Sequence, residues 1–287
     1  MRWWILAALL CLTAGSAGAD NLFGASRLLA TGGVTSLEGS AGGGIVPWAV
    51  IGGYGDRDQV GANAFYTRVQ SGAYHLNAYG LMAGLYDRVE LSLAQHRFDS
   101  EAVGASLGLG RGFTFTETVA GAKVRLAGDA VLEQDSLLPQ IALGVQYKHN
   151  NRGAVLRAIG ARDHQGVDLY LAATKLFLAD RVLANGTLRL TRANQLGILG
   201  FGGRSNAYRP QMEASLGYLL TRSLVIGAEY RMKPDNLASV HESDWADLFV
   251  AWFPSKHVSL TAAYARLGTV AIRRNQNALY LSLQVGF

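Results

Sequence analysis

The last ten residues of the chain, Ala278 to Phe287, read ALYLSLQVGF. Apolar residues occupy every second position, and mixed or polar residues such as Tyr280 stand between them. Strict alternation with a period of two predicts a β-strand with one apolar face. An ordinary half-buried strand is the alternative, because all antiparallel sheets share this period.

This strand ends on an aromatic residue, the last of the chain. A C-terminal strand with a terminal Phe resembles those of outer-membrane barrels, whose assembly machinery reads such a strand. The resemblance implies that Tyr280 and Phe287 form a membrane-insertion signal. It also implies the barrel-assembly machinery, outer-membrane lipid and lipopolysaccharide as partners.

The N-terminus predicts export. Residues 1–19 combine an early Arg, the apolar run Trp3–Leu12 and the small residues Ala17–Ala19, which together are typical of a secretory signal peptide. The apolar run is too short to span a bilayer as a helix. A lipidated Cys11 is the competing interpretation, but two leucines precede it where small residues are expected. We therefore expect cleavage after Ala19 and one mature domain, residues 20–287.

The composition favours a membrane barrel over a soluble β-sandwich. Cys11 is the only cysteine, so the mature chain can form no disulfide. The chain is 49% hydrophobic and only 16% charged. No later segment is long and apolar enough for a transmembrane helix. The net charge of +5, without a Lys/Arg block, gives no reason to expect a nucleic-acid partner.

Period-two segments recur along the chain and predict an all-β fold, a transmembrane antiparallel up-and-down barrel of about 12–16 strands. A count of sixteen includes strands at Arg27–Leu37, Ile45–Tyr54, Gly104–Thr114 and Ala154–Arg162. Residues 24–44 are Gly-rich, so this stretch is either the first strand or a plug inside the lumen. If it is a plug, the count falls to fourteen or twelve.

Seven charged residues fall opposite the apolar faces of their strands and are predicted to face the lumen: Lys123, Arg125, Arg189, Glu213, Glu229, Arg231 and Asp247. A charge that faces lipid at mid-bilayer is costly, so the lumen suits them better. They can line a pore constriction or form ion pairs that fill a closed barrel. Lys123 and Arg125 lack an obvious partner, which predicts a mild preference for anions.

No motif indicates an enzyme, a cofactor or a metal site. The histidines match no zinc pattern. Ser92 and His96 share a strand face but stand too far apart for a direct hydrogen bond. Loop carboxylates such as Asp99, Glu101 and Asp129 could bind divalent ions near lipopolysaccharide, although most such side chains are simply solvated. We therefore predict no catalytic residues, no cofactor and no metal.

Several longer runs resemble an uncharacterised bacterial family, domain of unknown function 3034. The runs are Thr31–Gly55, Tyr86–Ser92, Lys123–Val131, Asn185–Gly203, Glu229–Leu237 and Asp247–Gly268. They include TGGVTSLEGSAGGGIVPWAVIGGYG, NGTLRLTRANQLGILGFGG and DLFVAWFPSKHVSLTAAYARLG. The resemblance covers nearly the whole mature chain and implies an exported, outer-membrane protein. It implies no activity and no functional residues.

Three functions remain open at this point. The first is a porin-like channel for small solutes in the bacterial outer membrane. The second is a closed barrel with a structural or adhesive role, and the third, less favoured, is a lipid-active enzyme. Strand number separates the first two, because about eight strands fill with side chains while sixteen leave a channel.

Overall fold

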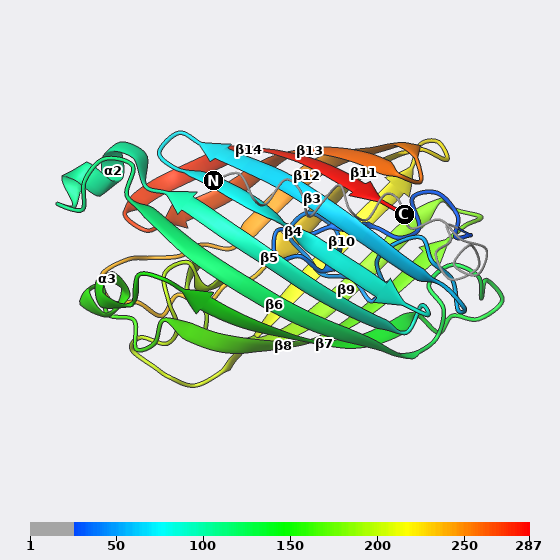
Figure 1. Cartoon of the computed structure of the whole chain (residues 1–287), viewed down its shortest axis with the longest axis horizontal. Coiled ribbons are helices and arrows are strands. Elements are labelled where there is room, and N and C mark those ends of the chain that lie inside the picture. The colour runs from blue at the N-terminus through cyan, green and yellow to red at the C-terminus, as the bar shows by residue number, and fades with distance from the viewer. Residues whose placement is uncertain (1–25) are drawn as a thin grey trace, which may run out of the picture.

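Twelve antiparallel strands close into a barrel, which confirms the predicted fold class (Figure 1). The computed structural model describes residues 26–287, so the predicted signal peptide lies outside the described residues. The wall consists of β3 (Val60–Ser71), β4 (His75–Leu85), β5 (Val89–Asp99), β6 (Thr114–Ala127), β7 (Gln140–Asn150), β8 (Gln165–Phe177), β9 (Val182–Thr191), β10 (Arg209–Leu219), β11 (Leu224–Arg231), β12 (Trp245–Ser255), β13 (Val258–Val270) and β14 (Arg273–Gly286).

Each wall strand pairs with its neighbours in sequence, and β14 pairs with β3 to close the wall. The last residue takes part in this seam, because Ala62 and Phe287 exchange two backbone hydrogen bonds of 2.8 and 3.0 Å. Residues 278–287 therefore all contribute to closure.

Alternation along each strand separates a lipid-type exterior from a packed interior. In β14, Leu279 and Leu281 are about half exposed at 51% and 48%, while Tyr280 between them is 1% exposed. The outward side chains of the other strands are mostly Leu, Val and Tyr. An apolar outer surface of this kind is typical of a barrel embedded in a bilayer.

The two ends of the barrel differ in the length of their connections. The end that contains the C-terminus has short turns at residues 86–88, 178–181, 220–223 and 256–257, and one longer loop at 128–139. The opposite end carries the loops 100–113, 151–164, 192–208 and 232–244. Outer-membrane barrels place their longer loops outside the cell, so we call this the outer end.

Two predicted strands are loops with short helices. The segment predicted at Gly104–Thr114 begins in α2 (Glu101–Ser106), and its later glycines adopt positive φ angles. The segment predicted at Ala154–Arg162 forms α3 (Gly153–Ala158), in which Leu156 is fully buried. The residues of this segment that pack on the core include Val155, Leu156 and Ile159, in which Ile159 lies four and three positions after the other two, the spacing of a helix face.

Because these two segments are not strands, β6 and β7, which lie between them in the sequence, run in the direction opposite to the predicted one. As a result, the acidic loop that contains Asp129, Glu133 and Asp135 lies at the C-terminal end of the barrel. The sequence predicted this loop at the outer end near lipopolysaccharide, and that prediction was wrong.

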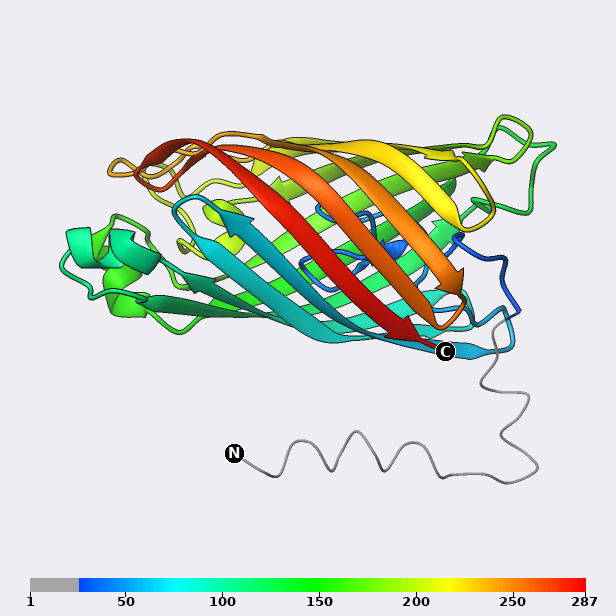
Figure 2. The same ribbon diagram turned by 90° about the horizontal axis from the view of Figure 1, so that it is seen from above.

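The segments Arg27–Leu37 and Ile45–Tyr54 are not wall strands either, so the barrel has twelve strands, the lower end of the predicted range of 12–16 and a count expected with a plug. Residues 27–54, here called the inner segment, run inside the barrel, where Figure 2 shows them as loops within the wall. Their regular structure is limited to β1 (Val34–Thr35) and β2 (Ala41–Gly42). No helix among residues 26–287 is long and apolar enough to cross a membrane.

Candidate functional site

The inner segment enters and leaves the lumen at the C-terminal end. The backbone N–H of Arg27 donates to the carbonyl of Tyr54, so the two ends of the segment lie side by side. The Arg27 guanidinium lies 3.5 Å from Asp87, in the turn between β4 and β5. Between these ends, residues 30–54 are buried.

Glu38 is the deepest charged group of the inner segment. Its carboxylate accepts hydrogen bonds from Lys148 of β7 and, at 2.7 Å, from Arg231 of β11. Arg189 of β9 lies 3.3 Å away. Burial alone raises the pKa of Glu38, but these three cations together hold it well below its usual range. Glu38 therefore remains ionised and ties three strands to the inner segment.

The three cations also bind wall carboxylates, which extends the network around the lumen. Lys148 lies 2.7 Å from Asp168, and Arg189 donates to Glu213 at 2.6 Å. The side chains in this network are almost completely buried. Such buried ion pairs are stable only when their remaining hydrogen-bonding groups are satisfied, and here most partners come from neighbouring strands.

A second anchor joins Glu90 of β5 to the inner segment. Its two carboxylate oxygens accept the backbone N–H groups of Ala41 at 3.1 Å and Gly52 at 2.9 Å. Lys123 of β6 lies 2.9 Å from Glu90 and donates to the carbonyl oxygens of Ala41 and Trp48. The pair therefore binds four backbone groups of the inner segment, of which the Ala41 carbonyl also accepts the backbone N–H of Trp48.

A third anchor lies on β10 and β11. Glu229 accepts the backbone N–H of Ile45 at 2.9 Å and the hydroxyl of Ser215 at 2.7 Å. The indole N–H of Trp48 in turn donates to Ser215 at 2.8 Å. A Cβ atom added at Gly43 would lie 1.9 Å from a Glu229 oxygen, so this close approach requires glycine.

His96, which shares a strand face with Ser92, has a structural partner at each ring nitrogen. His96 is fully buried, and its Nδ1 lies 2.8 Å from the Glu117 carboxylate. Its Nε2 lies 2.8 Å from the carbonyl oxygen of Leu37. Both ring nitrogens therefore bind structural partners, and neither contacts Ser92.

Six of the seven predicted lumen residues lie buried inside the barrel: Lys123, Arg189, Glu213, Glu229, Arg231 and Asp247. Arg125 lies at the C-terminal end, where it pairs with Asp87 and, at 3.1 Å, with Asp129. The expectation that Lys123 and Arg125 lack partners was therefore wrong. It failed because Glu90 and Asp87 had not been assigned to a face.

The two residues predicted as an insertion signal lie on opposite sides of the wall. Phe287 is half exposed at the C-terminal end, on the outward side. Tyr280 points inward, where its ring lies against Gly44 of the inner segment. Tyr280 thus packs against the inner segment, whatever role it has in assembly.

Sequence reasoning missed five charged members of the lumen: Glu38, Glu90, Glu117, Lys148 and Asp168. For Lys148 a signal existed, because the alternation of β7 continues past Tyr147 and places it inward. Glu38 gave no such signal, because it stands in a Gly-rich stretch without periodicity.

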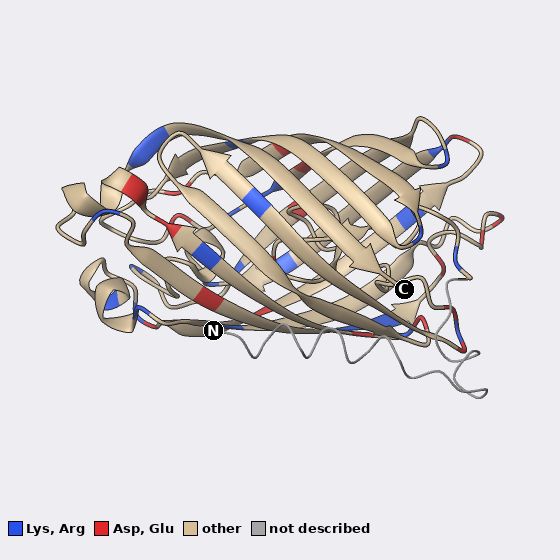
Figure 3. Ribbon diagram, turned by 45° about the horizontal axis from the view of Figure 1, so that its top comes forward, with Lys and Arg blue, Asp and Glu red and all other residues tan. Residues whose placement is uncertain are grey.

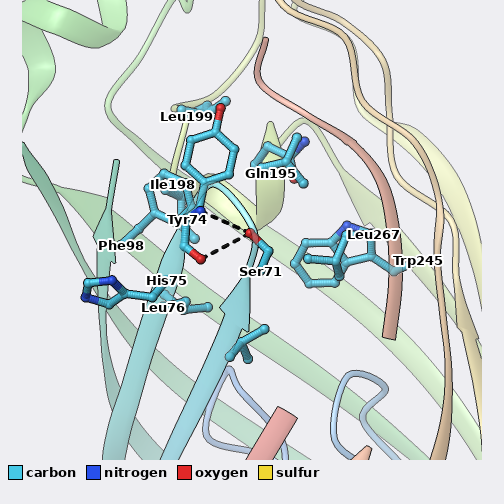
Figure 4. Close-up of a pocket in the computed structure, with 12 residues that line it drawn as sticks. Ser71, Tyr74, His75, Leu76, Phe98, Gln195, Ile198, Leu199, Trp245 and Leu267 are labelled. Atoms are coloured by element: carbon cyan, nitrogen blue, oxygen red, sulfur yellow. Dashed lines mark hydrogen bonds between the residues drawn. The ribbon is translucent and has the colours of Figure 1, made fainter. Parts of the chain in front are cut away.

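The outer end of the lumen is covered by two loops, residues 192–208 and 232–244, here called the outer lid. The first folds inward through η2 (Gln195–Gly197), where Leu196 adopts a φ of 66° and its carbonyl accepts a hydrogen bond from Lys148. Beneath it lies an apolar cavity of about 40 Å³. Figure 4 shows three aromatic residues around this cavity: Tyr74 in the turn before β4, Phe98 of β5 and Trp245 at the start of β12.

The outer lid is held by a buried ion pair. Lys233 lies 3.8 Å from Glu242 and donates to the side chain of Gln195 at 2.8 Å. Glu242 accepts the backbone N–H of Gln195, so the pair joins the two loops. Burial lowers the pKa of Lys233 to about 8 and raises the pKa of Glu242 to about 7.

One group of metal-type ligands lies at the outer rim. His75 Nδ1 lies 2.6 Å from Glu101, and its Nε2 lies 3.9 Å from Asp99. The three side chains are partly exposed; the His75 and Glu101 side chains hydrogen-bond to each other, and Asp99 accepts the backbone N–H of Glu101. The prediction of no metal site therefore remains a prediction.

Comparisons with known proteins agree with this architecture. The family described as "Protein of unknown function (DUF3034)" matches residues 31–284. No curated protein matches the sequence.

Two solved structures titled "KdgM porin" and "KdgM porin in complex with disordered oligogalacturonate" align with TM-scores of 0.51. They are 10% and 11% identical to this chain, and both alignments cover 78% of it and 99% of the porin. The COG4313 outer membrane channel from Pseudomonas putida F1 aligns with a TM-score of 0.46 and 14% identity, over 84% of this chain and 97% of the channel. At these identities the likeness shows a shared fold alone.

Proposed function

The chain belongs to the DUF3034 family, and we propose that it is a porin-like outer-membrane channel for small solutes whose lumen is plugged by the inner segment. One observation carries this proposal. The inner segment is a separate loop held in the lumen by hydrogen bonds and ion pairs to Glu90, Glu229, Lys148, Arg189 and Arg231, and by apolar packing of side chains such as Leu37, Ile45 and Trp48. None of these contacts is a backbone pairing of the wall, so the strands of the barrel can remain paired when the inner segment leaves.

The strand number supports a lumen that needs such a filling. Barrels of about eight strands fill with their own side chains, and larger barrels leave open space. In this twelve-strand barrel the inner segment occupies the middle of the lumen. Its removal would leave a passage lined by polar side chains.

The wall charges favour cations in an opened channel. On the lumen side of the wall, six buried carboxylates (Glu90, Glu117, Asp168, Glu213, Glu229 and Asp247) face four buried cations (Lys123, Lys148, Arg189 and Arg231). A fifth buried wall cation, Lys175 of β8, binds carbonyl oxygens of the loop 128–139 instead. Of the described residues, no Lys or Arg forms an ion pair with Glu229 or Asp247. Acidic linings favour cations in pores. This preference replaces the anion preference predicted from the sequence.

Planar-bilayer recordings test the proposal with the full-length protein and a variant that lacks residues 27–54. We expect rare, small openings for the full-length protein and a persistent, cation-preferring conductance for the variant. Heat-dependent gel mobility checks that both barrels are folded. A folded variant without conductance would contradict the channel.

A closed barrel with a structural role is the second candidate, and the buried ion network around Glu38 favours it. The same recordings separate the two candidates, because a structural barrel stays closed without the inner segment. We further propose that the protein has no enzymatic activity, and that Phe287 engages the barrel-assembly machinery. Deleting Phe287 should lower the amount of protein in the outer membrane, and unchanged levels would contradict that role.

A further inference from the structure

Two arginines interrupt the apolar outer surface on the wall formed by β3, β4 and β5. Arg68 of β3 and Arg97 of β5 are both exposed and point outward. The strand register places Asn77 of β4 directly between them. Figure 3 shows how few charged positions the strands of the wall carry.

All three residues lie close to the outer end of the barrel. Arg68 stands three residues before the end of β3, Asn77 two residues after the start of β4, and Arg97 two residues before the end of β5. Three residues span about 10 Å along a strand. The strand tilt of about 35–45° reduces this to roughly 7–8 Å along the membrane normal.

The outward-facing residues on the same strands, taken row by row away from the outer end, change from polar to aromatic to aliphatic, as expected at a membrane boundary. Tyr66 and Tyr79 form the next row, and the hydroxyl of Tyr66 donates to Asn77 at 2.7 Å. Leu81 and Leu93 follow, exposed by 63% and 54%. Tyrosines are enriched between head groups and hydrocarbon, so the arginines lie at the level of the head groups.

The charges of both arginines lack a protein partner. Arg68 donates only to the neutral side chains of Gln70, at 2.8 Å, and Asn77, at 3.4 Å. The side chain of Arg97 has no hydrogen-bond or ion-pair partner among residues 26–287. The nearest acidic group in the strand register, Asp99, lies one row further out and is directed to His75 and the backbone of Glu101.

We propose that Arg68 and Arg97, with Asn77 between them, bind the phosphate groups of lipopolysaccharide in the outer leaflet. The planar guanidinium group matches the geometry of phosphate and donates two parallel hydrogen bonds to it. Asn77 fixes the Arg68 side chain and can donate its amide to the same head group. This inference depends on the barrel's place in the membrane and not on whether the channel opens.

The test compares three purified proteins in detergent micelles: the wild type, the Arg68→Gln/Arg97→Gln variant and the control Arg88→Gln/Arg222→Gln. The control removes the same charge from exposed turns at the C-terminal end. Each protein is titrated with purified lipopolysaccharide, the same material after enzymatic removal of its phosphates, phosphatidylglycerol and inorganic phosphate. Bound lipid is measured by native mass spectrometry.

We expect the Arg68→Gln/Arg97→Gln variant to bind lipopolysaccharide about tenfold more weakly than the wild type or the control, since it loses charge-assisted hydrogen bonds. Removal of the phosphates should weaken wild-type binding to the same degree. Equal binding by the two double variants, or by the phosphorylated and dephosphorylated lipid, would overturn the proposal. Tighter binding of phosphatidylglycerol or inorganic phosphate would overturn the choice of lipid.

The variant Arg68→Lys/Arg97→Lys keeps the test valid if the glutamine variant does not fold. It retains both charges but loses the planar, two-pronged geometry. We expect intermediate affinity for lipopolysaccharide and a normal heat-dependent gel shift. Wild-type affinity of this variant at physiological salt would contradict the role of guanidinium geometry.

Discussion

The inner segment and the outer lid close the same lumen with different chemistry. The inner segment places one carboxylate, Glu38, among three cations that hold its pKa far below neutrality. The outer lid depends on Lys233 and Glu242, whose pKa values lie at about 8 and about 7. The difference lies in the number of opposing charges, because both sites are buried.

The side chain of Lys148 bonds to both closures. Lys148 binds Glu38 of the inner segment and, at 2.9 Å, the carbonyl oxygen of Leu196 in the outer lid. A carboxylate with several cations stays charged over the whole physiological range, whereas a lone buried pair titrates near neutral pH. The comparison predicts a permanent closure in the middle of the lumen and a pH-sensitive one at its outer end.

Removing the central charge should have the largest effect. Glu38→Gln leaves Lys148, Arg189 and Arg231 with less negative charge around them in a buried site. Breaking a buried ion pair from one side destabilises proteins by roughly 3–5 kcal/mol. Urea unfolding, followed by gel mobility, measures the loss. Glu133→Gln, in an exposed position, is the control, and equal stability of the two variants would refute the central role of Glu38.

Crowding the inner segment should have a smaller effect. Gly43→Ala introduces a Cβ atom 1.9 Å from the Glu229 carboxylate, so Glu229 or the inner segment must shift. Overpacking of this kind costs about 1–3 kcal/mol. Gly72→Ala is the matched control, because an added Cβ there meets nothing within 4 Å. The same urea titration applies, and a neutral Gly43→Ala would show that the inner segment is loosely held.

The pH response of the outer lid should be the mildest effect. The raised pKa of Glu242 stabilises the closed lid below about pH 4.5, and this contribution is lost as the pH rises through about 7. The lowered pKa of Lys233 stabilises the closed lid above about pH 10.5, and this contribution to stability is lost as the pH falls through about 8. The lid should therefore be weakest near pH 7–8 and tighten on acidification.

Hydrogen exchange of residues 192–208 between pH 5 and pH 7.5, corrected for the intrinsic rates, measures this response. Glu242→Gln should remove the dependence in that range, while the wild type should protect the lid better at pH 5. Asp235 and Asp244 also act on the pair, so Asp235→Asn serves as the control. Equal pH responses in the wild type and Glu242→Gln would exclude Glu242 as the titrating group.

Period-two alternation predicted the wall well, because each strand faces two different environments over its whole length. It failed at Ala154–Arg162 and Gly104–Thr114, where short apolar or Gly-rich stretches imitate a strand. The lumen was predicted only in part. Glu229 and Arg231 stand on clearly alternating strands, whereas the position of Glu38 depends on long-range contacts that follow no local period.

The adjacency of Arg27 and Tyr54 at one mouth of the barrel has a topological consequence. The inner segment is a loop whose two ends leave through the same opening, so it does not thread the barrel from end to end. It can slide in after β14 has sealed against β3, and it can be withdrawn without breaking a single pairing of the wall. The strand topology therefore does not couple insertion or removal of the inner segment to the pairing of the wall strands.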